Sequence, residues 1–479
     1  MPLRRIFKLF GKAEATPAEP VSSVPASIRI EERVVTREAH GISRRNISPN
    51  ALRVLYRLKE AGYGAYLVGG AVRDLLLGGH PKDFDVATSA TPEEVKQQFR
   101  NCRLIGRRFR LAHVMFGGEI IEVATFRASG DDGSGARHVV DGRIVRDNVY
   151  GTIEEDAIRR DFTVNALYYA IEDFSVRDFV GGYEDLEQRV LRLIGDAEQR
   201  YREDPVRMLR AVRLAAKLDF TIEPSAYAAI RKLAPLIAEA APARLFDELL
   251  KLFLSGHAVE SFRRLLDSGL LQEFLPQTAR ALATHAQGSG GTLIDAALAS
   301  TDERLAQEKP VSPAFLLAAL LWPAASKRYE GLTHDGIEPQ LAWIRASNHV
   351  IAEQVQRMAL PKRFTAPMQE IWALQPRFAL LNRKRAGRLM GHPRFRAAYD
   401  FFLLRALEEP ELAEAAQWWR ALVDHPHEAP PEPVPAKPAA KSAADAAAPS
   451  ENGAPRKRRR RRRRKPGGGT AREQHPPEA

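Results

Sequence analysis

The spacing of apolar residues changes once along this chain of 479 residues, close to Asp204. Before that point, apolar residues come in short or alternating runs broken by Gly, Asp and Pro, which is typical of short strands. After it, they recur every three or four residues, which is typical of amphipathic helices. The change predicts an α+β fold, with a small head built on a mixed or antiparallel sheet, followed by an all-helical neck and body.

The strand signal is clearest in four runs of the first half. They span residues 65–68, 84–87, 112–116 and 120–126. Ahead of them, Ser48 followed by proline begins a helical pattern that Gly62 stops, since Ser and Pro favour a helix start and Gly favours a helix end. The polar, Gly-rich segment 130–142 is predicted to be a mobile hairpin loop.

Helical spacing marks eight stretches of the second half. They span residues 205–218, 225–240, 244–254, 258–266, 313–321, 350–358, 368–374 and 410–423. From Pro426 onward the sequence is rich in Pro and Ala and has no period. Such a segment buries too little apolar surface to offset the entropy of ordering it, so a disordered basic C-terminal tail is predicted.

The positive charge of the chain is concentrated in that tail. Lys and Arg number 72 and Asp and Glu number 60, which gives a formal net charge of +12. Residues 456–465 are all Arg or Lys, so ten of the twelve excess charges lie in this run. A nearly neutral body with a strongly basic tail indicates a polyanionic partner such as nucleic acid.

Cysteine and hydropathy patterns predict a protein of the cytoplasm. The one cysteine, Cys102, cannot form an intramolecular disulfide or a zinc cluster, which favours a reducing compartment. No stretch approaches the roughly eighteen apolar residues of a membrane-spanning helix. Residues 1–10 are basic and amphipathic but lack the features of a signal peptide, so a frayed terminus is favoured over a weak membrane-surface contact.

The strongest chemical signal is a Gly pair followed, one short helix later, by a pair of carboxylates. Gly69 and Gly70 follow an apolar run and allow close backbone approach to a phosphate. Residues two apart on a strand project to the same side, so Asp83 and Asp85 should point together while Phe84 packs behind them. Adjacent carboxylates repel unless a cation lies between them, and oxygen-only ligands suit Mg²⁺ with phosphate oxygens completing its shell.

Each half of this signal has an ordinary alternative. A Gly-Gly pair is usually only a turn, and an Asp-x-Asp sequence is usually a solvated loop. Found together, the two halves favour a site that handles phosphates. In such a site Arg73, near the start of the intervening helix, could pair with a phosphate through two hydrogen bonds.

Segment 67–85 resembles the signature of the class II branch of the polymerase-β-type nucleotidyltransferases, which holds tRNA CCA-adding enzymes and bacterial poly(A) polymerases. Segments 159–167 and 203–213 resemble two further motifs in the family's order, so the resemblance covers the first half of the chain. It implies a two-metal Mg²⁺ site on Asp83 and Asp85, with ATP as a substrate. The residues expected to bind the nucleotide are Gly69, Gly70, Arg73, Arg160, Asp204, Arg207 and Arg210.

Two residues are candidates for a third carboxylate, which two-metal phosphoryl transfer usually uses. Glu122 lies in a strand expected beside the Asp83 strand, and its alternative is an exposed strand residue. Asp161 lies in the motif that the family associates with the sugar and the active-site floor. Its alternative is a salt bridge to Arg159 or Arg160. The resemblance favours Asp161 as a catalytic residue, and which of the two acids completes the metal site stays open.

The motif around Asp204 is predicted to read the nucleotide base. By itself, Asp followed by Pro is a good helix start. In the class II family the Glu-Asp-x-x-Arg motif recognises the base, and its residues correspond here to Glu203, Asp204 and Arg207. Adenine offers an amino donor to the Asp and a ring acceptor to the Arg. Arg210 and Arg213 then suit contacts with triphosphate or RNA, although a solvated helix face is an equal reading for Arg213.

The head alone does not distinguish polyadenylation from CCA addition. Segments 106–116 and 40–55 and the basic tail resemble the bacterial poly(A) polymerases. We therefore expect template-independent transfer of AMP from ATP to the 3′ ends of mRNA and small RNAs, by a monomer that serves RNA turnover together with RNA-decay proteins. CCA addition to tRNA is the enzymatic alternative, and a non-catalytic RNA-binding scaffold is the other.

The expected organisation has five parts. They are a flexible basic segment (1–45), a nucleotidyltransferase head (46–195), a helical neck that binds nucleotide and RNA (196–280), a helical body that binds RNA (281–425) and the tail (426–479). In the body, the cluster 383–388 is predicted to contact RNA, while Trp372 and Phe395 are expected in the core. The His334-Asp335 pair lacks accompanying His ligands and is interpreted as a turn.

Overall fold

The computed structural model describes residues 32–106, 110–128, 137–140, 143–147, 149–285 and 292–424. The strands are β1 Arg33–Val35, β2 Ala65–Val68, β3 Asp85–Thr88, β4 Cys102–Ile105, β5 Leu111–Phe116, β6 Glu119–Thr125, β7 Arg137–Val140, β8 Arg143–Asp147, β9 Leu167–Ala170, β10 Val176–Asp178, β11 Val190–Leu191 and β12 Thr221–Ile222. The helices among them are α1 Pro49–Glu60, α2 Gly70–Leu76, α3 Pro92–Gln98, α4 Ile153–Arg159 and α5 Gly182–Glu187.

The head is built on one mixed sheet, as the sequence predicts. Its strand order is β1-β10-β9-β2-β3-β6-β5-β4, and β3 and β6 run parallel while the other neighbours run antiparallel. Helix α1 begins at Pro49 behind its Ser48 cap and packs Val54, Leu55 and Leu58 into the head core. The sheet thereby buries one side under α1 and holds the ends of β2 and β3 side by side.

Four predicted strands are confirmed to within one residue at each end, as β2, β3, β5 and β6. The predicted loop 130–142 is wrong for residues 137–140, because they form β7 and pair antiparallel with β8. The segment from His138 to Val140 contains two valines, a residue type that favours strands. Residues 130–136 and 141–142 of that segment lie outside the described residues.

Residues 33–45, expected in a flexible segment, instead form part of the head. Strand β1 pairs antiparallel with β10, so three residues extend the sheet without needing an apolar period. His40 is buried, its Nε2 donates to the carbonyl oxygen of Phe174 at 2.8 Å, and its Nδ1 accepts from the amide of Ile42 at 3.2 Å. Strand β10 and Phe174 lie more than 130 residues further along the chain, so the local sequence could not predict that these residues are ordered.

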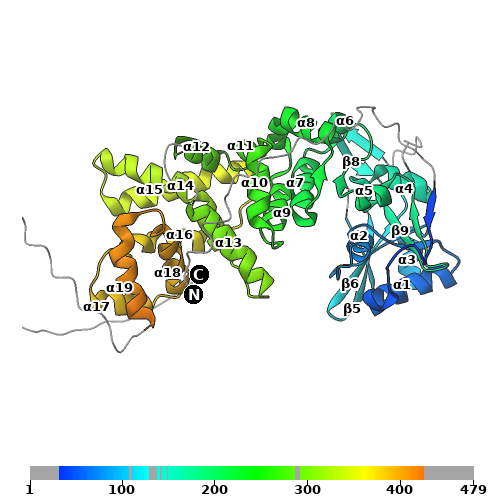
Figure 1. The fold of residues 1–479 in the computed structure, drawn as a ribbon, viewed down its shortest axis with the longest axis horizontal. Helices are drawn as coiled ribbons and strands as arrows, with labels where there is room; N and C mark the ends of the chain where they lie inside the picture. The colour runs from blue at the N-terminus through cyan, green and yellow to red at the C-terminus, as the bar shows by residue number, and fades with distance from the viewer. Residues whose placement is uncertain are drawn as a thin grey trace, which may run out of the picture. The chain divides into compact units, whose positions relative to one another are not determined.

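The remaining helices form the neck and body, coloured from green to orange in Figure 1. They are α6 Ala197–Glu203, α7 Val206–Leu218, α8 Pro224–Leu233, α9 Pro242–Phe253, α10 Ala258–Asp267, α11 Leu270–Phe274, α12 Pro276–His285, α13 Thr292–Ala306, α14 Pro313–His334, α15 Pro339–Arg357, α16 Lys362–Phe378, α17 Arg383–Met390, α18 Phe395–Arg405 and α19 Ala413–Asp424. All eight predicted stretches are helical, and α14 continues beyond its predicted end through Pro323. His334 is the last residue of α14 and Asp335 caps it, so the turn predicted for this pair begins at Asp335.

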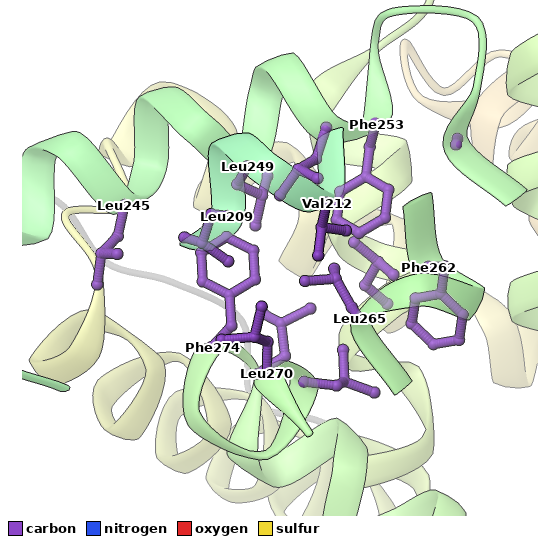
Figure 2. Packing of buried hydrophobic residues seen from close by; sticks show 14 of the residues in the cluster. Leu209, Val212, Leu245, Leu249, Phe253, Phe262, Leu265, Leu270 and Phe274 are labelled. Atoms are coloured by element: carbon purple, nitrogen blue, oxygen red, sulfur yellow. The ribbon is translucent and has the colours of Figure 1, made fainter. Parts of the chain in front are cut away.

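Helix α7 is packed from one side by the neck core. Figure 2 shows Leu209 and Val212 of α7 against Leu249 and Phe253 of α9, with Leu265 of α10 beside them. All of these side chains are fully buried. Because this packing occupies one face of α7, its arginines lie on the other faces, where Arg210 contacts Asp161 of the head and Arg213 contacts Glu248 of α9.

The body is held by a separate set of aromatic contacts. Trp372 is completely buried, and its Nε1 donates to the carbonyl oxygen of Ala318 at 3.1 Å, which confirms its predicted core position. Phe395 stacks on Tyr399 at 5.7 Å in a second cluster. Among the described residues, no helix is both long enough and apolar enough to cross a lipid bilayer.

Candidate active site

The Gly pair forms a turn directly beside the carboxylates. Val68, the last residue of β2, pairs with Asp85, the first residue of β3. Gly69 follows with a φ of +73°, a conformation that favours glycine, and caps the start of α2. A Cβ on Gly69 would lie 3.7 Å from Nη1 of Arg160, so this guanidinium faces the turn.

Asp83 and Asp85 occupy the positions that the sequence predicts relative to Phe84. Both carboxylates are exposed, whereas Phe84 is only 6% exposed. Strand β3 begins at Asp85, one residue later than expected, so Asp83 lies just ahead of the strand. The alternation nevertheless keeps both acids on the solvent side and anchors the segment through the phenyl ring.

Glu122 is the acid that the sheet places beside Asp85. The two residues are register partners in the parallel β3–β6 pair, and His113 of β5 is the partner of Glu122 on the other side. The His113 Nε2 lies 3.3 Å from Oε2 of Glu122. A row of polar side chains therefore crosses three adjacent strands and ends at the Gly pair.

The charge in this row is not balanced by the protein. Desolvation by the surrounding protein, followed by the negative charges of Glu122 and Asp83, raises the pKa of Asp85 to about 6, although Arg160 opposes the shift. A bound cation would relieve this repulsion, so the donor set fits Mg²⁺. Within the described ranges, no three His, Cys, Asp or Glu side chains converge on one metal position, so water and phosphate oxygens would have to complete the shell.

Arg160 is held in place at the edge of the site. Its Nη2 donates to Asp156 at 2.9 Å, its Nε donates to the hydroxyl of Tyr168 at 2.9 Å, and its guanidinium lies 5.1 Å from the Tyr168 ring centroid. Burial alone would lower the pKa of Arg160, but Tyr168 and Asp156 together raise it. Arg160 is therefore a fixed positive charge beside Gly69 and Asp85.

Asp161 pairs with Arg210 and not with Arg159 or Arg160. Nε of Arg210 donates to Oδ2 of Asp161 at 2.8 Å, and the Phe162 amide donates to Oδ1 at 2.9 Å. Burial would raise the pKa of Asp161, but Arg210 outweighs it and holds this pKa far below its usual value. The structure thus places Asp161 in an ion pair with Arg210, and a role for either residue at the metal or the triphosphate stays a prediction.

Arg73 is also occupied by protein groups. It is only 3% exposed, its Nε donates to Asp74 at 2.8 Å, and its Nη1 donates to Oδ1 of Asn165 at 2.5 Å. Its guanidinium is therefore bonded to protein groups in this structure, and the bidentate phosphate contact stays a prediction. Asp74 also accepts from Nζ of Lys217 at 2.9 Å, and neither of these two residues was singled out from the sequence.

The base-reading candidates lie where α6 meets α7. Asp204 is held by Arg244, whose Nη1 and Nη2 each donate to one carboxylate oxygen at 2.8 Å. Arg207 donates to Glu203 at 3.1 Å. Arg213 donates to the buried Glu248 at 3.0 Å, so it lies on neither a solvated face nor a nucleotide site. The sequence analysis did not identify Arg244, because it lies 40 residues from Asp204 and no local motif relates the two residues.

Replacing Arg210 with Met is expected to destabilise the protein by about 3 kcal/mol at pH 7, because Asp161 would stay buried without its cation. The depressed pKa of Asp161 contributes stability above the ordinary Asp pKa of about 4 and loses that contribution as the pH falls below it. The deficit of the variant should therefore keep its size down to about pH 4 and shrink at lower pH, as measured by urea unfolding at about pH 7 and about pH 3. The Arg210→Met/Asp161→Asn double variant is the control and should regain stability at pH 7. An equal deficit at both pH values would contradict the pairing.

On the body, α17 presents the predicted basic cluster. Its four cationic side chains are exposed, namely Arg383, Lys384, Arg385 and Arg388, while Ala386 and Leu389 face the core. This alternation leaves a positively charged helix face available to a polyanion.

Three family models match the chain. They are described as a poly A polymerase head domain (residues 65–192), a probable RNA- and SrmB-binding site of polymerase A (219–282) and a polymerase A arginine-rich C-terminus (335–465). The chain is 51% identical over 393 residues to Poly(A) polymerase I of Salmonella typhi, which covers 81% of this chain and 84% of that protein. It is 46% identical over 397 residues to Poly(A) polymerase I of Haemophilus influenzae, covering 82% and 88%.

CCA-adding enzymes resemble the chain less extensively in sequence. The enzyme of Lactobacillus gasseri is 40% identical over 225 residues, which is 47% of this chain and 54% of that protein. Among solved structures, the Bacillus stearothermophilus CCA-adding enzyme in complex with CTP has a TM-score of 0.52 and 28% identity, covering 80% of this chain and 84% of that one. The fold is thus shared with a CCA-adding enzyme, whereas the curated sequence similarity covers 81–82% of the chain for these two Poly(A) polymerase I proteins and 47% for the Lactobacillus gasseri CCA-adding enzyme.

Proposed function

The chain belongs to the bacterial poly(A) polymerase family of nucleotidyltransferases, and from that premise we propose that it transfers AMP from ATP to RNA 3′ ends without a template. The observation that carries the proposal is the exposed Asp83–Asp85 pair beside the Gly69-Gly70 turn. In the proposal, the pair and the turn provide metal ligands and a phosphate-binding turn where β2 ends and β3 begins. No side-chain nucleophile is needed, because the RNA hydroxyl attacks directly.

In this proposal Asp83 and Asp85 hold two Mg²⁺ ions, and Glu122 is the third acid in place of Asp161. Glu122 is preferred because it is the register partner of Asp85, whereas Asp161 is neutralised by Arg210. When bound, Mg²⁺ lowers the pKa of the RNA 3′-hydroxyl and balances the charge of the triphosphate.

The chain's own groups would orient the triphosphate. The backbone amides at Gly69 and Gly70 and the fixed charge of Arg160 surround the place where its oxygens would lie. The 3′ oxygen forms a bond with the α-phosphorus as the bond from that phosphorus to the bridging oxygen breaks, and pyrophosphate leaves.

Asp204 and Arg207 are proposed to select adenine. Arg244 donates to both carboxylate oxygens of Asp204, and the Val206 amide donates to Oδ1 at 3.3 Å, so these contacts fix the orientation of the carboxylate that would accept from the adenine amino group. Arg207 would donate to a ring nitrogen of the base. We propose positioning roles for Arg73, Asp161 and Arg210. Asn165 accepts a hydrogen bond from Arg73 and donates one to Asp161, and Arg210 donates to the same Asp161 carboxylate.

RNA is proposed to follow the neck and body. Residues 219–282 match a family model described as RNA-binding, and the exposed cations of α17 extend the positive surface. The five-part organisation, action in the cytoplasm on mRNA and small RNAs with RNA-decay proteins, and the monomeric state remain predictions. The possible membrane contact of residues 1–10 and the disorder of the tail fall outside the described residues.

The reaction can be tested by following pyrophosphate release. The purified protein with ATP, Mg²⁺ and an unstructured RNA should release pyrophosphate, and the same RNA ending in a 3′-deoxyribose should not support release. This control distinguishes transfer to the 3′-hydroxyl from simple hydrolysis of ATP. Equal release with both RNAs would rule out the proposed acceptor.

Deleting residues 456–465 is expected to weaken RNA affinity and to flatten its dependence on salt, because ten positive charges that displace counterions would be lost. Fluorescence anisotropy of labelled RNA, titrated at several salt concentrations, measures both effects. The control replaces the ten residues with Gly and Ser at equal length and should behave like the deletion. A change in nucleotide choice would instead place the run in the active site.

A further inference from the structure

Helix α7 makes two ion pairs with the head from one of its faces, in addition to its apolar contacts. Arg210 and Lys217 are seven residues apart on this helix, so they lie two turns apart on the same side. Arg210 bonds to Asp161, and Nζ of Lys217 donates to Oδ2 of Asp74 at 2.9 Å. Both acids belong to the head, so α7 is fastened across a length of about 10 Å at 1.5 Å per residue.

The two acids are also linked to one another inside the head. Oδ1 of Asp74 accepts from Nε and Nη2 of Arg73 at 2.8 and 2.6 Å. Nη1 of Arg73 donates to Asn165 at 2.5 Å, and Nδ2 of Asn165 donates to Asp161 at 3.2 Å. Together with Arg210 and Lys217, these four side chains form a chain of hydrogen bonds whose two ends both lie on α7, so that the helix backbone closes the loop. We term this set the α7 ring.

The α7 ring touches the catalytic turn. A Cβ on Gly70 would lie 3.4 Å from Nη2 of Arg73, so the guanidinium lies directly against the Gly pair. Arg73 and Asn165 are 3% and 8% exposed, which shields the centre of the ring from water and strengthens its hydrogen bonds. Lys217 lies at the rim, with its side chain 36% exposed.

We propose that Lys217, through Asp74, is a positioning residue that fixes the direction of α7 relative to the metal carboxylates. This inference rests on the proposed function. Apolar packing and the Arg210–Asp161 pair hold the first half of α7, and the Lys217–Asp74 pair adds an attachment two turns further along that limits rotation of the helix. The base-reading Asp204 and Arg207 sit at the other end of the same helix region, so rotation of the helix would move the base relative to Asp83 and Asp85. In-line transfer does not tolerate such a shift, since a displacement of about 1 Å can cost as much as about 100-fold in rate.

Replacing Lys217 with Met tests the proposal. The kcat with ATP should fall about 10-fold. The ratio of kcat/KM for ATP to kcat/KM for CTP should also fall, because CTP is poorly aligned in the unmodified protein and its rate has less to lose from the substitution. The KM for RNA should stay unchanged. Lys217→Arg keeps the charge and should restore most of both quantities. The matched control is Lys232→Met. It removes an ion pair within the neck, in which Nζ of Lys232 lies 2.6 Å from Oε1 of Glu198, and it leaves the α7 ring intact.

The outcomes separate this inference from the proposed function. If the unmodified protein adds no AMP, the proposed function fails. If it adds AMP and Lys217→Met keeps the kcat and the ATP-to-CTP ratio of Lys232→Met, the positioning role is overturned. A Lys217→Met variant that only unfolds at lower temperature, with an unchanged ratio below that temperature, would also overturn it. A double-mutant cycle with Asp74→Asn should be strongly non-additive, and additive effects would contradict the pairing.

Discussion

Replacing either Asp83 or Asp85 with Ala should lower the rate of AMP incorporation by at least about 10³-fold, since the metal ligands supply several kcal/mol of transition-state stabilisation. The two side chains are exposed and bear no structural contact that the core depends on, so folding should be preserved. Affinity for RNA should be equal or slightly higher, because the variants lose negative charge. Single-turnover incorporation of labelled ATP and RNA anisotropy measure the two quantities.

A matched control keeps this prediction specific. Asp335 is another exposed acid, with its side chain 74% accessible at the turn after α14. Asp335→Ala should retain full activity. If Asp83→Ala and Asp85→Ala also kept activity within tenfold of the unmodified protein, this carboxylate pair would not be the metal site.

The second large effect is expected on nucleotide choice. Asp204→Ala should lower the preference for ATP over CTP by about 100-fold in kcat/KM, because a charged acceptor for the adenine amino group disappears and Arg244 loses its partner. Arg244→Leu should act in the same direction with a smaller effect, since Asp204 keeps its charge but not its orientation. Competition between labelled nucleotides on one RNA measures the preference directly.

The control for nucleotide choice removes a different ion pair of the neck. Glu248→Gln breaks the 3.0 Å contact with Arg213, one turn along α7 from Arg210, and should lower stability while leaving the ATP preference intact. If it altered the preference as much as Asp204→Ala, general damage to the neck would explain both results.

The parts of the site that could be predicted follow local rules. Asp83, Phe84 and Asp85 alternate because neighbouring residues of an extended chain face opposite sides, and Gly69 stands where a positive φ is needed. The change of period near Asp204 likewise predicts the α+β head and the helical body. Each of these inferences depends on residues within a few positions of one another.

The parts that could not be predicted depend on distant pairings. Asp204 meets Arg244 across 40 residues, Asp161 meets Arg210 across 49, and Asp74 meets Lys217 across 143. A sequence identifies charged side chains but not which opposite charge the tertiary fold brings near. For this reason, the sequence predicted phosphate contacts for Arg73 and Arg210 and a catalytic role for Asp161, whereas the fold satisfies these three residues internally.

The same reasoning explains the choice of a third acid. From the sequence, Glu122 and Asp161 were both candidates, and the family resemblance favoured Asp161. The parallel pairing of β3 with β6 places Glu122 opposite Asp85, whereas Asp161 is paired with Arg210, and these two observations favour Glu122. The neighbouring strand determines which side chains lie next to a polar residue of an alternating strand, and the local sequence does not show which strand that is.

The most direct test of the central claim is an analysis of the products made from each labelled nucleotide. The protein is given ATP, CTP, GTP or UTP with Mg²⁺, once with an unstructured RNA and once with a tRNA that lacks its 3′-terminal CCA. Long products containing only A, on both RNAs, are the predicted result. Addition of C, C and A to the tRNA alone would identify a CCA-adding enzyme, and the absence of any product would leave an RNA-binding scaffold. Either of these two results would contradict the account.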